Sequence, residues 1–362
     1  LTVEAVLGER GAIGDLIEDF HPRQSQIDMA RLIEEAMAEG ESKVIEASTG
    51  IGKTFAYLVP AFLSNARVVI STGTRNLQDQ LFHKDIPLIR KAIVSSRKTA
   101  LLKGRSNYCC PHRVKMYRDQ GQFKSREMSA IFSSLSQWAA HSESGDISEF
   151  SSIPENDSLW YYATSNADNC LGSECPEIDQ CFVVKARKKA MDADIVVINH
   201  HLYFSDLALK EDGFGEILPQ AEVLIFDEAH QLPDIASHFY GQQISMRQVE
   251  MLCRDCIEAE LAEAAESKSL HQPTDALKKS VADLRLAFQP FPERAEWPRI
   301  QKVPAIQQAV DLVLEAIAGV VVSLEPMVSR GKELASCQRR LEELDAGLRA
   351  FLNPDDNQVN WY

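Results

Sequence analysis

The order of apolar and polar residues divides the chain into two parts. In the first part, short apolar runs alternate with stretches of helical spacing, and the runs read as buried strands: residues 43–47, 67–72, 193–201 and 222–230. Strands that alternate with helices predict a parallel sheet in an α/β fold. After Pro233 the pattern changes to long, charge-rich helical stretches, namely residues 249–265, 274–286, 306–324 and 332–352. This second part is predicted to be an all-helical domain with an acidic surface.

Composition narrows the class of protein. The chain has 362 residues, of which 45% are apolar, and this predicts two or three domains of a globular protein. We find no charged-then-apolar leader and judge no apolar run long enough to span a bilayer, so a cytoplasmic protein without a membrane partner is expected. Leu1 in place of Met indicates a fragment or a processed chain. The net charge of −15 argues against uniform coating of nucleic acid, although a local basic channel is compatible with it.

Residues 47–54 have the sequence expected of a phosphate-binding loop, between a predicted strand and a predicted helix. Gly50 and Gly52 allow a tight turn whose N–H groups point at phosphate oxygens, and the N-terminus of the following helix adds its dipole. Lys53 is predicted to reach the β- and γ-phosphates. Thr54 is predicted to place its hydroxyl on Mg²⁺. The loop therefore predicts nucleotide binding.

Two residues near this loop qualify the prediction. Ala47 stands where the usual motif has its first glycine, so the match is not literal, and the alternative is a glycine-rich turn that caps an ordinary helix. Upstream, the amide of Gln26 has the donor and the acceptor that both edges of adenine require. Gln26 is equally expected to be a solvated helix residue.

The run at residues 222–230 ends in Asp227, Glu228, Ala229 and His230. Four apolar residues deliver this acidic pair to the end of a strand. Beside a phosphate-binding loop, Asp227 is predicted to bind Mg²⁺ and Glu228 to orient and deprotonate the attacking water. His230 is expected to link nucleotide state to substrate contacts. The predicted catalytic residues are Lys53, Asp227, Glu228 and His230, whereas His200 and His201 fit a helix cap or a packed imidazole at least as well as a catalytic role.

Basic residues gather in two places although the whole chain is acidic. Between Lys84 and Arg126, twelve cations face only two anions, and a second cluster surrounds Lys185 and Lys188. Such clusters suit a polyanionic backbone, and a solvated helical face is the alternative. Thr72 and Thr74 should lie at the carboxyl edge of the sheet, where ligands of such folds bind, or cap the next helix. The predicted DNA-binding residues are Thr72, Gly73, Thr74, Arg105, Lys185 and Lys188.

Five of the eight cysteines lie between or beside the basic clusters: Cys109, Cys110, Cys170, Cys175 and Cys181. Their spacing differs from the two-residue spacing of zinc fingers. Four thiolates suit an iron–sulfur cluster, zinc bound by four cysteines stays open, and unrelated buried thiols are the third alternative. The polar stretch between these cysteines is predicted to need a metal to hold it together. Cys253 and Cys256 are expected to be packed or free thiols.

Taken together, these motifs resemble the XPD-like iron–sulfur DNA helicases of superfamily 2, and especially their bacterial DinG/YoaA-type branch. The segments that carry the resemblance are residues 20–26, 47–54, 71–74, 103–108, 194–201 and 227–230, together with the four spaced cysteines. The resemblance implies a nucleotide-binding set of Arg23, Gln26, Ser48, Thr49, Gly50, Ile51, Gly52, Lys53 and Thr54. It also implies a 4Fe-4S cluster on Cys110, Cys170, Cys175 and Cys181, with Cys110 chosen over Cys109.

The resemblance implies a domain order as well. Residues 1–104 and 186–238 would form a RecA-like motor lobe, 105–185 an inserted iron–sulfur domain, 239–355 a helical arch, and 356–362 the return to the lobe. The whole protein would couple ATP hydrolysis with Mg²⁺ to 5′ to 3′ movement on single-stranded or forked DNA in repair or replication. A repair or replication protein is an expected partner, and a monomer is expected.

One departure bears on activity. This sequence contains no Ser-Ala-Thr segment and no Gln-x-x-Gly-Arg-x-x-Arg segment, so the second motor lobe and its arginine are missing. We therefore expect the chain alone to bind ATP and DNA weakly, to hydrolyse ATP poorly and not to unwind DNA. Two rival interpretations are a DNA- or protein-docking module with a vestigial ATPase, and a zinc-stabilised phosphate-loop ATPase that acts on another substrate.

Overall fold

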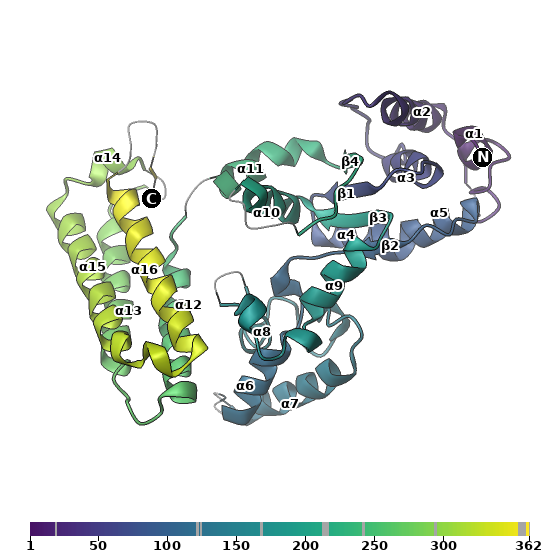
Figure 1. The fold of residues 1–362 in the computed structure, drawn as a ribbon. Helices are drawn as coiled ribbons and strands as arrows, with labels where there is room; N and C mark the ends of the chain where they lie inside the picture. Colours follow the sequence, from purple (N-terminus) through teal and green to yellow (C-terminus); the bar gives the residue numbers. More distant parts are fainter. Residues whose placement is uncertain are drawn as a thin grey trace. The chain divides into compact units, whose positions relative to one another are not determined.

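The computed structural model describes residues 1–18, 20–120, 123, 125–166, 169–211, 217–240, 243–292, 295–353 and 360–361. The chain divides into two compact units. The first contains residues 1–108 and 180–241, and the second contains residues 109–179 and 242–362. Each unit is therefore built from two separate segments of the sequence (Figure 1).

The first unit is an α/β lobe. Its strands are β1 (Val68–Thr72), β2 (Thr99–Leu101), β3 (Ile195–Asn199) and β4 (Val223–Phe226), and its helices are α1 (Val3–Leu7), α2 (Gln24–Glu39), α3 (Lys53–Leu63), α4 (Arg75–Gln80), α5 (Ile86–Ile93), α9 (Phe182–Met191), α10 (His200–Glu211) and α11 (Leu232–Tyr240). Shorter π and 3₁₀ turns are Leu81–Asp85, Arg105–Asn107 and Ala229–Gln231. The sheet order is β2-β3-β1-β4, and every pairing is parallel.

Both faces of the sheet are covered, because successive side chains of a strand point to opposite faces. Val68 and Ile70 of β1 pack on one face with α1, α2, α3 and α5. Val69 packs on the other face with residues of α9 and α10. A parallel sheet buried on both faces explains why β1 and β3 read as continuous apolar runs. The expected parallel-sheet lobe is confirmed.

The predicted strand at residues 43–47 is wrong. This segment is extended but forms no strand, and Val44 is fully exposed. Only Ile45 and Ala47 are half-buried, because Lys43 and Glu46 interrupt the apolar positions. In the described sheet β4 is an edge strand, and Leu224 on it is 46% exposed.

The second unit is mostly helical. Its helices are α6 (Pro111–Gln120), α7 (Arg126–His141), α8 (Trp160–Ala163), α12 (Met246–Glu263), α13 (His271–Phe288), α14 (Trp297–Ile300), α15 (Pro304–Leu324) and α16 (Lys332–Leu352). Its 3₁₀ turns are Ile147–Glu149, Gly172–Glu174 and Glu325–Arg330, and a further one, Ile178–Gln180, lies at the boundary between the units. The long helices α12, α13, α15 and α16 enclose one apolar core that includes Cys253, Cys256 and Cys337 as free, buried thiols.

The inserted segment has an apolar core of its own. Phe132 and Leu135 of α7 are buried, and Trp160 packs edge-on against Phe150, whose ring also meets Trp138. Aromatic rings bury large areas and prefer such tilted contacts. Side-chain packing therefore contributes to the order of a segment that we expected to depend on metal.

Helix α15 corrects the statement that no apolar run is long enough to span a bilayer. Residues Pro304–Arg330 form a helical stretch of 27 residues, within which an 18-residue window has a mean hydropathy of 1.8. Length and composition alone therefore permit a span. Within the second unit, however, Val313, Ile317 and Val320 of this helix pack in the core of the long helices.

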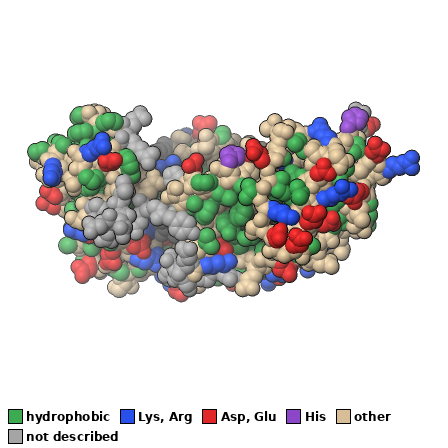
Figure 2. All heavy atoms as spheres, turned by 90° about the horizontal axis from the view of Figure 1, so that it is seen from above, with side chains coloured by type: hydrophobic (Ala, Val, Ile, Leu, Met, Phe, Trp, Pro, Cys, Tyr) green, Lys and Arg blue, Asp and Glu red, His purple; other side chains and the backbone are tan. Residues whose placement is uncertain are grey.

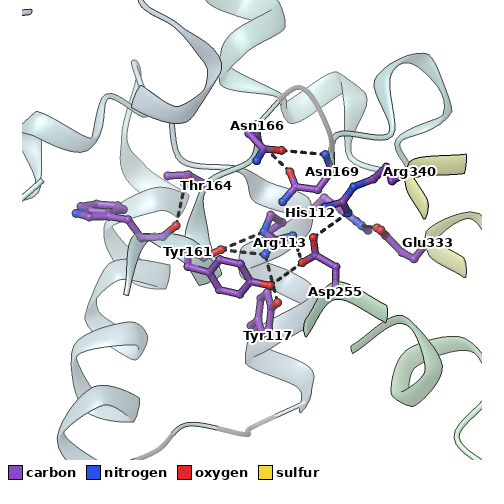
Figure 3. Close-up of polar contacts among 11 residues, drawn as sticks. His112, Arg113, Tyr117, Tyr161, Thr164, Asn166, Asn169, Asp255, Glu333 and Arg340 are labelled. Carbon is purple, nitrogen blue, oxygen red and sulfur yellow. Dashed lines mark hydrogen bonds and ion pairs between the residues drawn. The ribbon is translucent and has the colours of Figure 1, made fainter. Parts of the chain in front are cut away.

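A buried charge cluster joins the inserted segment to the long helices (Figure 3). Asp255 of α12 accepts a hydrogen bond from the Tyr161 hydroxyl at 2.6 Å and pairs with Arg340 of α16 at 2.8 Å. Arg113 of α6 lies 3.7 Å from the same carboxylate and donates to the Tyr161 carbonyl at 2.9 Å. Further out, His112 meets Glu333 at 2.6 Å. Two arginines and one tyrosine thus share one carboxylate.

We predict that Asp255→Ala destabilises the protein by about 3–5 kcal/mol, because it leaves Arg113 and Arg340 buried without their shared carboxylate. The midpoint of urea unfolding measures this change. The control is Asp275→Ala, which removes an exposed pair with Lys278 and should cost about 0.5 kcal/mol or less. Equal losses from the two substitutions would contradict the role given to the cluster.

Candidate nucleotide site

The loop before α3 has the backbone of a phosphate-binding turn. Gly50 and Gly52 adopt φ values of +83° and +88°, which only glycine adopts freely, and Gly52 is the N-cap of α3. In the part of the chain that the structure describes, the N–H groups from Thr49 to Gly52 form no hydrogen bond with the protein. These donors and the N-terminus of α3 therefore suit an anion.

Gln26 supports this loop from α2. Its amide Nε2 donates to the Gly52 carbonyl at 2.9 Å, and its side chain is only 3% exposed. A Cβ atom at position 52 would lie 2.2 Å from the same Nε2. Gly52 is thus required by its φ angle and by this contact. Arg23, the other residue predicted from this segment, is exposed at the N-cap of α2.

The side chain of Lys53 lies over the end of β4. Its Nζ is 3.2 Å from Glu228 Oε1, and His230 Nδ1 is 3.4 Å from Glu228 Oε2. The structure therefore brings three of the four predicted catalytic residues into one charged group. A phosphate that enters the loop would replace Glu228 as the partner of Lys53, which leaves the carboxylate for another ligand.

Asp227, the fourth predicted catalytic residue, follows β4 directly. Its N–H donates to the Ser71 carbonyl at 2.9 Å, and its Oδ2 accepts a hydrogen bond from the Tyr57 hydroxyl at 3.2 Å. Burial raises the pKa of Asp227, and the neighbouring Glu228 raises it further. Because the charged form of this carboxylate is disfavoured, a bound cation would stabilise it strongly.

Glu228 itself is strained. It has φ +55° and ψ +45°, the left-handed region that costs a non-glycine residue roughly 1–2 kcal/mol. Such a conformation persists only where the surroundings enforce it, and it is frequent at functional sites. The turn at residues 227–231 is therefore held by contacts outside itself.

Sequence reasoning missed or left open four residues of this site. Tyr57 follows Lys53 by four positions, so helical spacing places both on one face of α3, and this signal was available. His200 is fully buried between Ser71 and the Asp227 carbonyl, so of the predicted alternatives it is a packed imidazole. Gln231 carried no signal, and the contact of Ser71 with His200 was not predicted, because the partners of both residues lie more than a hundred positions away in the sequence.

The residues predicted to bind DNA lie at different places on the first unit. Thr72 is buried at the end of β1 and donates to the Thr74 carbonyl at 3.3 Å, and Thr74 caps α4. Gly73 lies between them. On α9, Lys188 is exposed and Lys185 lies 5.3 Å from the centre of the Phe182 ring. Arg105 is half-buried at the start of a 3₁₀ turn.

Many cations of the predicted basic stretch stabilise the fold. Lys103 is buried against Asp79 at 2.7 Å, and Arg113 is buried against Asp255. Arg97 donates to several backbone carbonyls, including that of Ala61 at 2.5 Å. The count of twelve cations therefore overstates the charge available to a polyanion. On the face shown in Figure 2, Lys and Arg side chains lie among Asp and Glu side chains.

The cysteines differ in their exposure. Cys109 is 1% exposed, and its backbone forms a bridge with Thr164. Cys110, Cys170, Cys175 and Cys181 are half-buried and form no disulfide, and the Cys170 sulfur accepts an N–H bond from Gly172 at 3.4 Å. The first three belong to the second unit and Cys181 to the first. Among the described residues, no three metal-ligating side chains form a group that holds an ion.

We predict that Asp227→Asn raises the melting temperature of the unliganded protein at pH 7. The raised pKa means that the folded protein disfavours the Asp227 charge, so the wild type loses stability as the pH rises from the unfolded-state pKa through the folded pKa. The gain should shrink as the pH falls, because the wild-type carboxyl then takes up a proton. Thermal unfolding between pH 4 and 8 measures it, with the exposed Asp15→Asn as control. A gain that does not change with pH contradicts the assignment.

The sequence of the chain matches families and proteins that are already known. Models described as DEAD/DEAH box helicase and DEAD_2 match residues 27–107 and 74–249. The chain is 41% identical over 340 residues to the ATP-dependent DNA helicase YoaA of Haemophilus influenzae, which covers 94% of this chain and 53% of that protein. It is 32% identical over 254 residues to the ATP-dependent helicase DinG of Mycobacterium tuberculosis, with 64% and 38% covered.

A solved structure named truncated XPD aligns with 87% of this chain and 81% of its own, at 16% sequence identity and a TM-score of 0.40. The chain spans about half the length of the YoaA proteins that it matches. The expected resemblance to the DinG/YoaA-type helicases is confirmed by the sequence matches. By sequence, the chain is thus similar to DEAD/DEAH box helicases and to proteins of the DinG/YoaA type.

Proposed function

We propose that this chain is the ATP-binding part of an ATP-dependent DNA helicase. One observation carries the proposal: the loop lysine Lys53 meets Glu228 at 3.2 Å, beside Asp227 at the end of a parallel strand. A basic loop residue and an acidic pair at this edge are what nucleotide hydrolysis with Mg²⁺ requires. The related YoaA and DinG proteins are named ATP-dependent helicases.

Each residue of the site has a definite task in this proposal. The free N–H groups of the loop and Lys53 would bind the β- and γ-phosphates. Thr54 and Asp227 would hold Mg²⁺, and Tyr57 would orient the Asp227 carboxylate. Glu228, released from Lys53, would orient the attacking water and accept its proton. Gln26 would set the loop through its contact with Gly52.

We further propose the domain roles that the resemblance implies. Residues 1–104 and 186–238 would form the motor lobe, 105–185 the iron–sulfur domain and 239–355 the helical arch, whereas residues 356–362 lie largely outside the described residues. Thr72, Gly73, Thr74, Arg105, Lys185 and Lys188 would contact single-stranded DNA, with 5′ to 3′ movement in the whole protein. We propose that the protein is a cytoplasmic monomer and that it binds a repair or replication protein.

The cysteines fit an iron–sulfur cluster by their chemistry. Cys110, Cys170, Cys175 and Cys181 are half-buried and form no disulfide, and the N–H bond to the Cys170 sulfur is of the kind that cluster ligands accept. Cys109 is buried, so it suits a cluster ligand less well. A 4Fe-4S cluster bound here would cross-link segments that are far apart in the sequence.

We predict that Lys53→Ala weakens Mg²⁺–ATP binding by about ten- to a hundredfold, because it removes a charge-assisted contact to phosphate. Glu228→Gln should retain binding but slow hydrolysis by about 10²- to 10⁴-fold. Calorimetry measures the first effect, and release of labelled phosphate measures the second. Lys43→Ala is the control, since Lys43 pairs only loosely, at 3.9 Å, with Glu35 and Glu41. If Lys53→Ala binds ATP as tightly as the control, the site is wrong.

We predict that Cys110→Ala removes iron from the anaerobically purified protein and that Cys109→Ala does not. The reason is that Cys110 is a half-buried free thiol, whereas Cys109 is enclosed by the inserted segment. Iron and sulfide assays and the visible absorption of the protein measure the outcome. A colourless protein that contains zinc would indicate a zinc site in place of the cluster. Equal loss of iron from both variants would contradict the choice of Cys110.

A further inference from the structure

The strained turn at residues 227–231 is attached at both of its ends to the end of strand β1. At its first end, the Asp227 N–H donates to the Ser71 carbonyl at 2.9 Å, and the imidazole of His200 connects the same two residues through its ring. At its second end, the Gln231 side chain rests on Gly73. Ser71 and Gly73 are only two positions apart, so one short piece of backbone holds the whole turn.

The hydrogen bonds of His200 define its tautomer. Nε2 lies 2.9 Å from the Asp227 carbonyl, which can only accept, so Nε2 carries the proton. Nδ1 must then accept from the Ser71 hydroxyl, at 2.7 Å. A ring with 0% exposure and both nitrogens occupied cannot itself reach a nucleotide.

The contact at Gly73 is equally close. A Cβ atom at position 73 would lie 2.4 Å from Gln231 Oε1 and 2.9 Å from its Nε2. The Gln231 N–H also donates to the Glu228 carbonyl at 3.1 Å, which closes the turn behind the strained residue. Only a residue without a side chain at position 73 leaves room for Gln231 in this place.

We propose that His200 is a positioning residue for Glu228, and that the end of β1, Ser71–Gly73, is the support on which the turn is held. The inference rests on the proposed ATPase function, because Glu228 is the group that meets the attacking water. His200 does not touch the nucleotide. It holds the Asp227 carbonyl, and Asp227 is directly followed by the residue whose left-handed conformation needs support.

The test compares His200→Gln with His200→Asn. A glutamine amide reaches the position of Nε2 and can still donate to the Asp227 carbonyl, whereas an asparagine amide reaches only the position of Nδ1. We expect His200→Asn to lower the rate of hydrolysis at saturating ATP by about ten- to a hundredfold with little change in ATP affinity, and His200→Gln to recover most of this loss. His201→Asn is the matched control, since His201 is the exposed neighbour.

Hydrogen exchange gives a second readout that does not depend on hydrolysis. In the unliganded protein, the peptide that covers residues 223–232 should exchange faster in His200→Asn, and should exchange as in the wild type in His200→Gln and His201→Asn. The peptide of α2 should be unchanged in all of them, which excludes general destabilisation. Equal exchange at residues 223–232 in the wild type and His200→Asn would overturn the proposal.

A double-variant cycle tests the other end of the turn. Gly73→Ala pushes Gln231 aside, and Gln231→Ala removes the same contact, so each should speed exchange at residues 223–232 and the double variant should do no more than either alone. Additive effects of the two substitutions on exchange would overturn the proposal that the Gly73–Gln231 contact holds the turn. A wild-type protein that binds no Mg²⁺–ATP would sink the proposed function instead, while the exchange data would still decide whether His200 and Gly73 hold the turn.

Discussion

Parallel pairing of β1 with both β3 and β4 is the constraint on which the site depends. Parallel strands end at the same edge of a sheet, so Thr72, Asn199 and Phe226, the last residues of β1, β3 and β4, finish at one edge although more than 150 positions separate the first from the last. The residues that follow them are Gly73 and Thr74, His200 and the Asp227–Glu228 pair. Helix α3 packs on the same lobe and brings Lys53 and Tyr57 to this edge.

The second unit is stabilised by apolar packing and by a buried charge cluster. Its long helices bury an ordinary apolar core, but the inserted segment joins them through charges that have been removed from water. Such a cluster is weak support for stability, because removing its charges from water costs free energy that their pairing only offsets. Arg113 follows Cys110 by three positions. The order of the cysteine segment is thus tied to that of the long helices.

The local part of the nucleotide site was predictable from the sequence. Glycines at positions 50 and 52, a lysine at 53 and an acidic pair after an apolar run each have a chemical reason that acts over a few residues. The contacts that support these groups were not predictable, because Ser71, His200 and Gln231 meet only through strand order. The choice of Cys110 over Cys109 came from the resemblance and stays a prediction, to which the structure adds that Cys109 is the more buried of the two.

A local pattern leaves two questions open. Residues 43–47 were predicted as a strand from three apolar positions, although strand formation also needs a neighbour to pair with. The stretch at residues 306–324 was predicted as a helix and is helix α15, but its length and apolar composition alone also permit a membrane span. The packing of Val313, Ile317 and Val320 in the core of the second unit is not visible from the sequence.

The central claim is that Lys53, Thr54, Asp227 and Glu228 act together on one nucleotide. A crystal structure of the chain with Mg²⁺ and a non-hydrolysable ATP analogue tests this most directly. The account predicts the γ-phosphate within hydrogen-bonding distance of Lys53 Nζ, the metal ion on Thr54 and Asp227, and Glu228 released from Lys53 toward the terminal phosphate. A nucleotide bound elsewhere, or one bound with the Lys53–Glu228 pair intact, would contradict it.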